Sequence, residues 1–125
     1  MQAEVTPQEI RIYHSADVLF DFDKVDLKPA AEAQLDNLLT VVNSKPNAVV
    51  AAIEGHTDLR GDDTYNLTLS QRRAESVRGW LIARGVPGAR LTAAGSGEAR
   101  PLQTGDSEAD HQVNRRVEIR IGSDN

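Results

Sequence analysis

The stretch VVAAIEGHTDLRGDD, residues 49–63, decides how the chain is interpreted, because an apolar run there ends abruptly in polar and acidic residues. The part AVVAAIEG, residues 48–55, is apolar at both strand parities, which is typical of a strand covered on both faces. Gly55 is expected to end this strand. Ligands of open α/β sheets bind just past the carboxyl ends of strands, so the polar cluster of residues 54–63 is a candidate site.

The sequence on either side of this stretch alternates between strand and helix patterns. Segments 27–47 and 64–85 carry apolar residues at helical spacing. Segments 9–23, 89–97 and 114–122 show the short or alternating apolar patterns that predict strands, with one or two strands in the first. The order β-α-β-α-β-β predicts a two-layer α+β fold, in which helices pack on a mixed sheet.

Length and composition limit the chain to one domain. It has 125 residues, 39% of them apolar, which is enough for one core. We expect a leader or linker at residues 1–8, the domain at 9–122 and a tail at 123–125. The net charge of −5 argues against a nucleic-acid partner, and the absence of cysteine excludes disulfides. No apolar run reaches the roughly 20 residues of a membrane span.

The polar cluster after the predicted strand admits several kinds of chemistry. His56 and Asp58, with two further acids nearby, suggest a metal site, but none of the three histidines forms a metal-binding pair at helical spacing. Thr57 and Ser70 lack a motif that would activate a nucleophile. We therefore expect no metal, no cofactor and no catalytic residue. A solvated polar loop remains the simplest alternative to a ligand site.

Arg73 gives the ligand site its main support. On a helical wheel of about 100° per residue, Arg73 lies within the apolar arc of the second helix, whereas Arg72 lies outside it. A guanidinium stays charged at any ordinary pH and is costly to bury without an anion. That anion is either a neighbouring carboxylate or a ligand carboxylate. Asp58 and Arg73 together suit a zwitterion, since the acid can take an ammonium and the arginine a carboxylate.

Five motifs in order, LFDFDK, EGHTD, YNLTLSQRRAESV, GSGEARP and NRRVEI, resemble the OmpA-like peptidoglycan-binding domain. This domain is shared by the C-terminal region of OmpA, peptidoglycan-associated lipoprotein and MotB. The resemblance covers about residues 18–121 and implies the β-α-β-α-β-β fold without enzymatic activity. It further implies a periplasmic domain that binds the diaminopimelate of peptidoglycan, and a parent protein anchored in the outer membrane.

The resemblance also assigns roles to individual residues. It implies that Asp58 and Arg73 hold diaminopimelate. Residues at other motif positions are expected to contribute in a second tier, some of them through backbone groups: Asp21, Phe22, Asp23, Thr57, Asn66, Leu69 and Arg115. His56 is expected to be a positioning residue. Two other functions stay open, a ligand-free domain of the same fold that contacts other envelope proteins, and a metal-dependent hydrolase.

Overall fold

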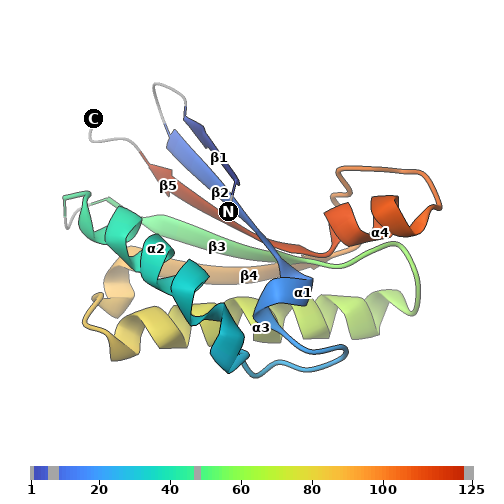
Figure 1. The fold of residues 1–125 in the computed structure, drawn as a ribbon, viewed down its shortest axis with the longest axis horizontal. Helices are drawn as coiled ribbons and strands as arrows, with labels where there is room; N and C mark the ends of the chain where they lie inside the picture. Colours follow the sequence, from blue (N-terminus) through green and yellow to red (C-terminus); the bar gives the residue numbers. More distant parts are fainter. Residues whose placement is uncertain (1, 6–8, 47–48, 123–125) are drawn as a thin grey trace.

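The computed structural model of the chain describes residues 2–5, 9–46 and 49–122 (Figure 1). Five strands form one sheet in the order β1-β2-β5-β3-β4. All neighbouring strands are antiparallel except β3 and β4, which are parallel, so the predicted mixed sheet is confirmed. The strands are β1 (Gln2–Val5), β2 (Glu9–Ser15), β3 (Ala51–His56), β4 (Leu91–Gly97) and β5 (Arg116–Gly122).

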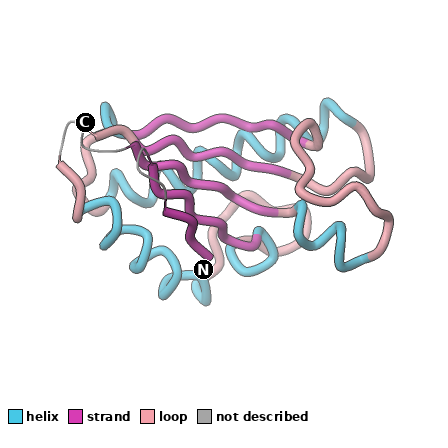
Figure 2. Tube along the Cα trace, turned by 90° about the horizontal axis from the view of Figure 1, so that it is seen from above, coloured by secondary structure: helices cyan, strands magenta, loops and turns pink. Residues whose placement is uncertain are grey.

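Two long helices pack on one face of this sheet, as Figure 1 shows. The helices and 3-10 turns are α1 (Ala16–Leu19), η1 (Pro29–Ala31), α2 (Glu32–Asn43), α3 (Asp63–Ala83), η2 (Gly88–Arg90) and α4 (Glu108–Asn114). Seen from above, the strands run side by side, and the loops after β3 and β4 gather at one end of the sheet (Figure 2). This end carries the polar cluster.

The core is aliphatic and lies between the sheet and the two long helices. Alternate strand residues face α2 and α3 and are almost fully buried, among them Ile12, Ile53, Val117, Ile119 and Ile121. The apolar stripes predicted for the two helices pack against these strand residues. They are Leu35, Leu38 and Val42 of α2 and Ala74, Val77 and Leu81 of α3. Burying a large aliphatic side chain stabilises the fold by about 1.5–3 kcal/mol, so this layer fixes the sheet against the helices.

Gly55 does not end β3, which continues to His56. The residue faces α3, where a Cβ atom would overlap the backbone carbonyl of Ser70. Gly95 in β4 likewise meets the backbone of Gln71. These glycines let the start of α3 lie directly against the two strands. The expectation that Gly55 breaks the strand was therefore wrong, because the glycine allows close packing and does not end the pairing.

The N-terminal part of the chain also differs from the expectation. Gln2–Val5, within the predicted leader or linker, pairs with β2 as an edge strand. Residues 1 and 6–8 of that segment, and the predicted tail at 123–125, lie outside the described residues. The second apolar alternation, around Val18 and Phe20, forms the single-turn helix α1 and an isolated bridge between Phe20 and Leu27. Within the described ranges, no helix has the length and apolar character needed to cross a membrane.

Candidate functional site

A cavity of about 740 Å³ lies at the end of the sheet where β3 stops. Its walls come from the loop after β3, the first half of α3, the segment 17–28 and the start of α4. The nine residues expected from the sequence to contact the ligand are all in this lining: Asp21, Phe22, Asp23, Thr57, Asp58, Asn66, Leu69, Arg73 and Arg115. We call this space the charged cavity, because acids and arginines from four segments meet in it.

Arg73 points into the charged cavity as a buried cation. It is 7% exposed, whereas its neighbour Arg72 is exposed, as the helical wheel predicts. Its Nε donates to the Lys24 carbonyl at 2.8 Å and its Nη2 to the Asp21 carbonyl at 3.2 Å. The guanidinium also lies over the Phe20 ring, 4.9 Å from its centre.

The charge of Arg73 has no anionic partner within the described part of the chain: its hydrogen bonds go to backbone carbonyls, and no carboxylate lies within 4.0 Å. Burial away from water lowers the pKa of Arg73 below its usual range. An arginine nevertheless keeps its proton at neutral pH. Within the described residues the charge of Arg73 therefore has no direct ion pair, although the charges of Asp17 and Asp23 raise its pKa against the effect of burial.

Asp58, on the facing wall of the cavity, already has oppositely charged partners. It is 9% exposed, and its Oδ1 accepts the backbone N–H of Arg60 at 3.0 Å. Its Oδ2 accepts the side chains of Arg60 at 2.8 Å and Arg115 at 3.0 Å. Burial alone would raise the pKa of this carboxyl, but the hydrogen bonds from Arg60 and Arg115 outweigh burial and lower the pKa to about 2. Asp58 is thus ionised and already paired on both oxygens.

Arg115 joins three acids at the back of the charged cavity. It donates to both oxygens of Asp17, at 3.0 and 2.9 Å, and to Asp58 and Glu108 at 3.0 and 2.9 Å. Hydrogen bonding to Asp17 is the main reason why the pKa of Arg115 is raised. Arg115 is therefore paired with three carboxylates, and these ion pairs tie α1, the loop after β3 and α4 together.

The segment of Asp21, Phe22 and Asp23 forms the opposite rim as a tight turn. Lys24 N–H donates to the Asp21 carbonyl at 3.0 Å, and Asp23 has a positive φ of 62°. The Asp23 carboxylate accepts the hydroxyl of Tyr65. This geometry leaves the Phe22 side chain 95% exposed, although its position alternates with buried Phe20 in the sequence. The rim contributes backbone carbonyls to Arg73 and an apolar ring to the solvent side.

Two smaller side chains hold the loop after β3 in place. The Asn66 side chain, 6% exposed, donates to the Arg60 carbonyl at 2.8 Å. Thr57 donates its backbone N–H to the Gly97 carbonyl at 2.9 Å and its hydroxyl to the Asp58 carbonyl at 3.0 Å. Leu69 adds a half-buried apolar surface to the cavity. Asn66 and Thr57 therefore fix where Asp58 stands relative to α3.

Four charged residues of the cavity were not selected from the sequence: Asp17, Lys28, Arg60 and Glu108. Asp17 and Glu108 lie far from the polar cluster in sequence, and only the fold brings them to Arg115. Arg60 offered a signal, since it stands two residues after Asp58 in the same loop. An acid and a base at this spacing in a tight turn can pair locally, as they do here.

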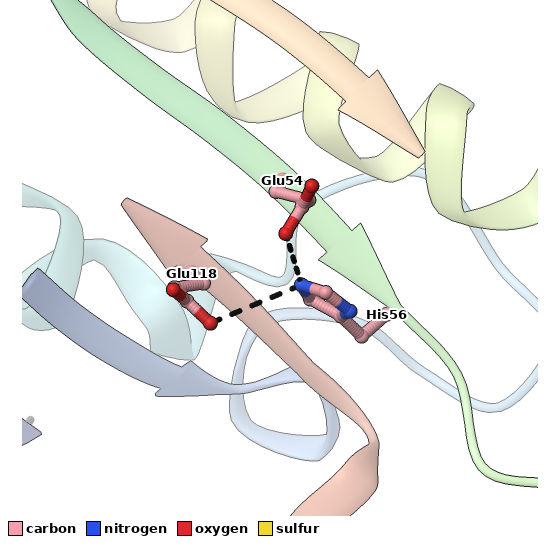
Figure 3. Close-up of side chains that lie close together, drawn as sticks. All are labelled: Glu54, His56 and Glu118. Atoms are coloured by element: carbon pink, nitrogen blue, oxygen red, sulfur yellow. Dashed lines mark ion pairs between the residues drawn. The ribbon is translucent and has the colours of Figure 1, made fainter. Parts of the chain in front are cut away.

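His56 lies apart from the charged cavity, on the sheet face opposite α2 and α3. Because β3 continues through Gly55, His56 follows Glu54 on this face and meets Glu118 of β5 (Figure 3). Its Nε2 is 2.8 Å from Glu54 and 3.9 Å from Glu118. The donor set considered from the sequence, His56 with Asp58, is therefore divided between two places. The role of positioning residue in the site is not supported by this location.

The trio of Glu54, His56 and Glu118 has donor atoms of the kinds that zinc uses, all within 4.8 Å of one another. Burial, helped by the charge of Arg116, lowers the pKa of His56 to about 4, so its ring is neutral at pH 7. Four arginines surround the two carboxylates at 3.5–4.0 Å: Arg11, Arg100, Arg116 and Arg120. The negative charge of the trio is thus already balanced, and we interpret it as an ion-pair network.

Fold and cavity together define a class of protein: a small α+β domain with a charged cavity at the end of its sheet. The chain belongs to the OmpA family, whose profile matches residues 19–115. The resemblance inferred from the five motifs is thereby confirmed.

Relatives and solved structures agree with this assignment. The chain is 45% identical to outer membrane porin F of Pseudomonas fluorescens, over 84% of this chain and 32% of the porin. It is 43% identical to peptidoglycan-associated lipoprotein of Pseudomonas putida, over 81% of this chain and 60% of the lipoprotein. The structure of the cell wall anchor of the T6SS from Pseudomonas aeruginosa superposes with a TM-score of 0.89 at 25% identity, covering 98% of this chain and 87% of the anchor. The chain thus spans less than two thirds of these two sequence relatives.

Proposed function

We propose that this domain binds cell-wall peptidoglycan without covalent chemistry, through the diaminopimelate of the stem peptide. The observation that carries the proposal is Arg73, a buried cation that lines the cavity and has no carboxylate partner among the described residues. A buried guanidinium without an anion is unfavourable, so an anionic ligand group would remove this cost. The carboxylate at the end of the diaminopimelate side chain has the required charge.

The remaining donors of Arg73 suit such a group. A guanidinium has five N–H donors, and the two backbone carbonyls engage only Nε and Nη2. Nη1 keeps both of its hydrogens for a ligand, and charge-assisted hydrogen bonds to a carboxylate are the strong kind. On the facing wall, Asp58 is ionised and would take the ammonium group beside that carboxylate. The cavity then binds one zwitterionic end of the ligand between two opposite charges.

The cavity supports binding better than catalysis. It combines fixed charges with backbone carbonyls. Its most buried acid, Asp58, is held by two arginines and has a lowered pKa, whereas a general acid needs a raised one. We therefore propose a non-enzymatic wall-binding module. The names of the relatives, an outer membrane porin and a peptidoglycan-associated lipoprotein, support a periplasmic location and a role in attaching a parent protein or the outer membrane to the wall.

Co-sedimentation with insoluble peptidoglycan sacculi tests this proposal. Wild type should pellet with sacculi, and Arg73→Ala should stay in the supernatant. Arg72→Ala is the matched control, since it removes the same charge from the adjacent, exposed position. Circular dichroism must show that each variant is folded. The proposal would be wrong if folded Arg73→Ala pelleted as well as wild type and Arg72→Ala.

A further inference from the structure

We infer that Arg60 is an internal competitor of the ligand: its guanidinium occupies the place on Asp58 that a ligand ammonium would take, and it moves to Glu108 when the ligand binds. This inference rests on the proposed function and adds that Arg60 lowers the affinity of the domain for its ligand. It concerns a residue that neither the sequence motifs nor the charge of Arg73 pointed to.

The first support is that described residues engage three of the roughly four acceptor sites of the Asp58 carboxylate. One oxygen accepts a backbone N–H, and the other accepts two guanidinium groups, those of Arg60 and Arg115. An ammonium that pairs with Oδ2 has to replace one of these two guanidinium groups. The ligand therefore exchanges one cation for another at this carboxylate, and the net attraction is smaller than for an unpaired acid.

The second support is that Arg60 is the donor most easily replaced. Its side chain is 54% exposed, against 20% for that of Arg115. Arg115 is held by both oxygens of Asp17 and by Glu108 in addition to Asp58. Among the described residues, the guanidinium of Arg60 makes one short contact, the 2.8 Å bond to Asp58. Displacing Arg60 thus breaks one ion pair whose arginine is half exposed, whereas displacing Arg115 breaks ion pairs with three acids.

The third support is that a second acceptor already stands beside Arg60. Its Nη1 lies 3.5 Å from the Glu108 carboxylate, which is 67% exposed at the start of α4. That distance is longer than a charge-assisted hydrogen bond, so the contact can tighten when the bond to Asp58 is lost. The backbone of Arg60 stays fixed meanwhile, because its N–H bonds to Asp58 and its carbonyl accepts from Asn66. Only the side chain has to move.

Isothermal titration of two ligands into three proteins tests the inference. The ligands are free meso-diaminopimelate and pimelate, which has the same carbon chain and carboxylates but no ammonium groups. The proteins are wild type, Arg60→Leu and the matched control Arg72→Leu, which loses the same charge outside the cavity. Arg60→Gln provides a polar second variant in case the leucine lowers solubility, and thermal melting checks the fold of each.

We expect Arg60→Leu to bind diaminopimelate about two- to fivefold more tightly than wild type, the range set by an exposed ion pair. Arg72→Leu should bind like wild type. Pimelate should show no gain with Arg60→Leu, since it brings no ammonium to Asp58. Glu108→Gln should weaken diaminopimelate binding in wild type and have a smaller effect in the Arg60→Leu background.

The outcomes separate this inference from the proposed function. If wild type binds diaminopimelate but Arg60→Leu binds it equally or more weakly, Arg60 is not a competitor and only this inference fails. The same conclusion follows if Arg60→Leu gains equally for pimelate, because the effect would then not involve an ammonium. If wild type binds neither diaminopimelate nor sacculi, the proposed function fails and this inference falls with it.

Discussion

The two walls of the charged cavity contain buried charges in opposite situations. Arg73 on α3 is 7% exposed and bonds to backbone carbonyls without a carboxylate, whereas Asp58 after β3 is 9% exposed and is paired with two arginines. Burial is nearly equal, so burial does not distinguish the two walls; the difference is the counterion. The wall that lacks a counterion should dominate ligand affinity, and the wall that has one should contribute more to stability.

The largest expected effect is the loss of affinity in Arg73→Ala. Removing the charge that meets the ligand carboxylate should weaken binding of a diaminopimelate stem peptide about 30- to 1000-fold. Stability should change by no more than about 1–2 kcal/mol, because two hydrogen bonds to carbonyls are lost while a buried charge is also removed. Calorimetry gives the affinity and urea unfolding gives the stability. A variant that loses stability but keeps its affinity would reverse the roles assigned to the two walls.

Asp58→Ala should show the opposite balance. It leaves the guanidinium groups of Arg60 and Arg115 without their shared acid, and breaking a partly buried network of this kind should lower the free energy of unfolding by about 1–3 kcal/mol. Affinity should fall as well, because the ligand ammonium loses its partner. Urea unfolding of Asp58→Ala and Arg73→Ala under the same conditions checks this prediction. The prediction would be wrong if Arg73→Ala were the more destabilised of the two variants.

The pH dependence of stability should report the same carboxylate. The pKa of Asp58 is lowered from 3.8 to about 2 in the folded protein. A lowered folded pKa contributes stability above the unfolded pKa, and this contribution is lost as the pH falls from about 4 to about 2. The contribution is at most about 2 kcal/mol. Urea unfolding at pH 7, 4 and 2 should show that the free energy of unfolding falls less on acidification in Asp58→Asn than in wild type. Equal falls in the two proteins would contradict the assignment.

The smallest expected effect is that of metal removal. Binding of a zwitterionic group between Arg73 and Asp58 needs no bridging ion. The trio of Glu54, His56 and Glu118 lies on the other face of the sheet. Treatment with EDTA should therefore leave sacculus binding unchanged within error. A loss of binding that a divalent ion restores would show that the charged cavity, or the trio acting through the sheet, depends on a metal.

The sequence was sufficient to place Arg73 and Asp58 on the right elements. The helical wheel separated inward Arg73 from outward Arg72, and the end of an apolar strand located Asp58. Both depend on local periodicity, which a single sequence records. The mixed sheet and the aliphatic core followed from the same periodicity, because the apolar faces of the strands and of the helices are buried against one another.

What the sequence did not reveal depends on contacts between distant segments. Gly55 was interpreted as a strand breaker. The reason for a glycine there is the close approach of the Ser70 backbone, which is visible only in the packed structure. Leu67 is an apolar residue of α3 whose side chain is nevertheless 50% exposed, and it is the backbone of Leu67 that lies against Gly97 of β4. The partners of Arg115 come from positions 17, 58 and 108, a grouping that no spacing predicts.

The most direct test of the account compares two stem peptides that differ only in the carboxylate assigned to Arg73. One carries diaminopimelate and the other lysine, which lacks the carboxylate at the end of the side chain. A site built around a polar contact rejects an analogue that lacks it, so calorimetry should give the lysine peptide an affinity about 30- to 1000-fold lower. Equal affinities would contradict the account, since Arg73 would then hold a group common to both peptides.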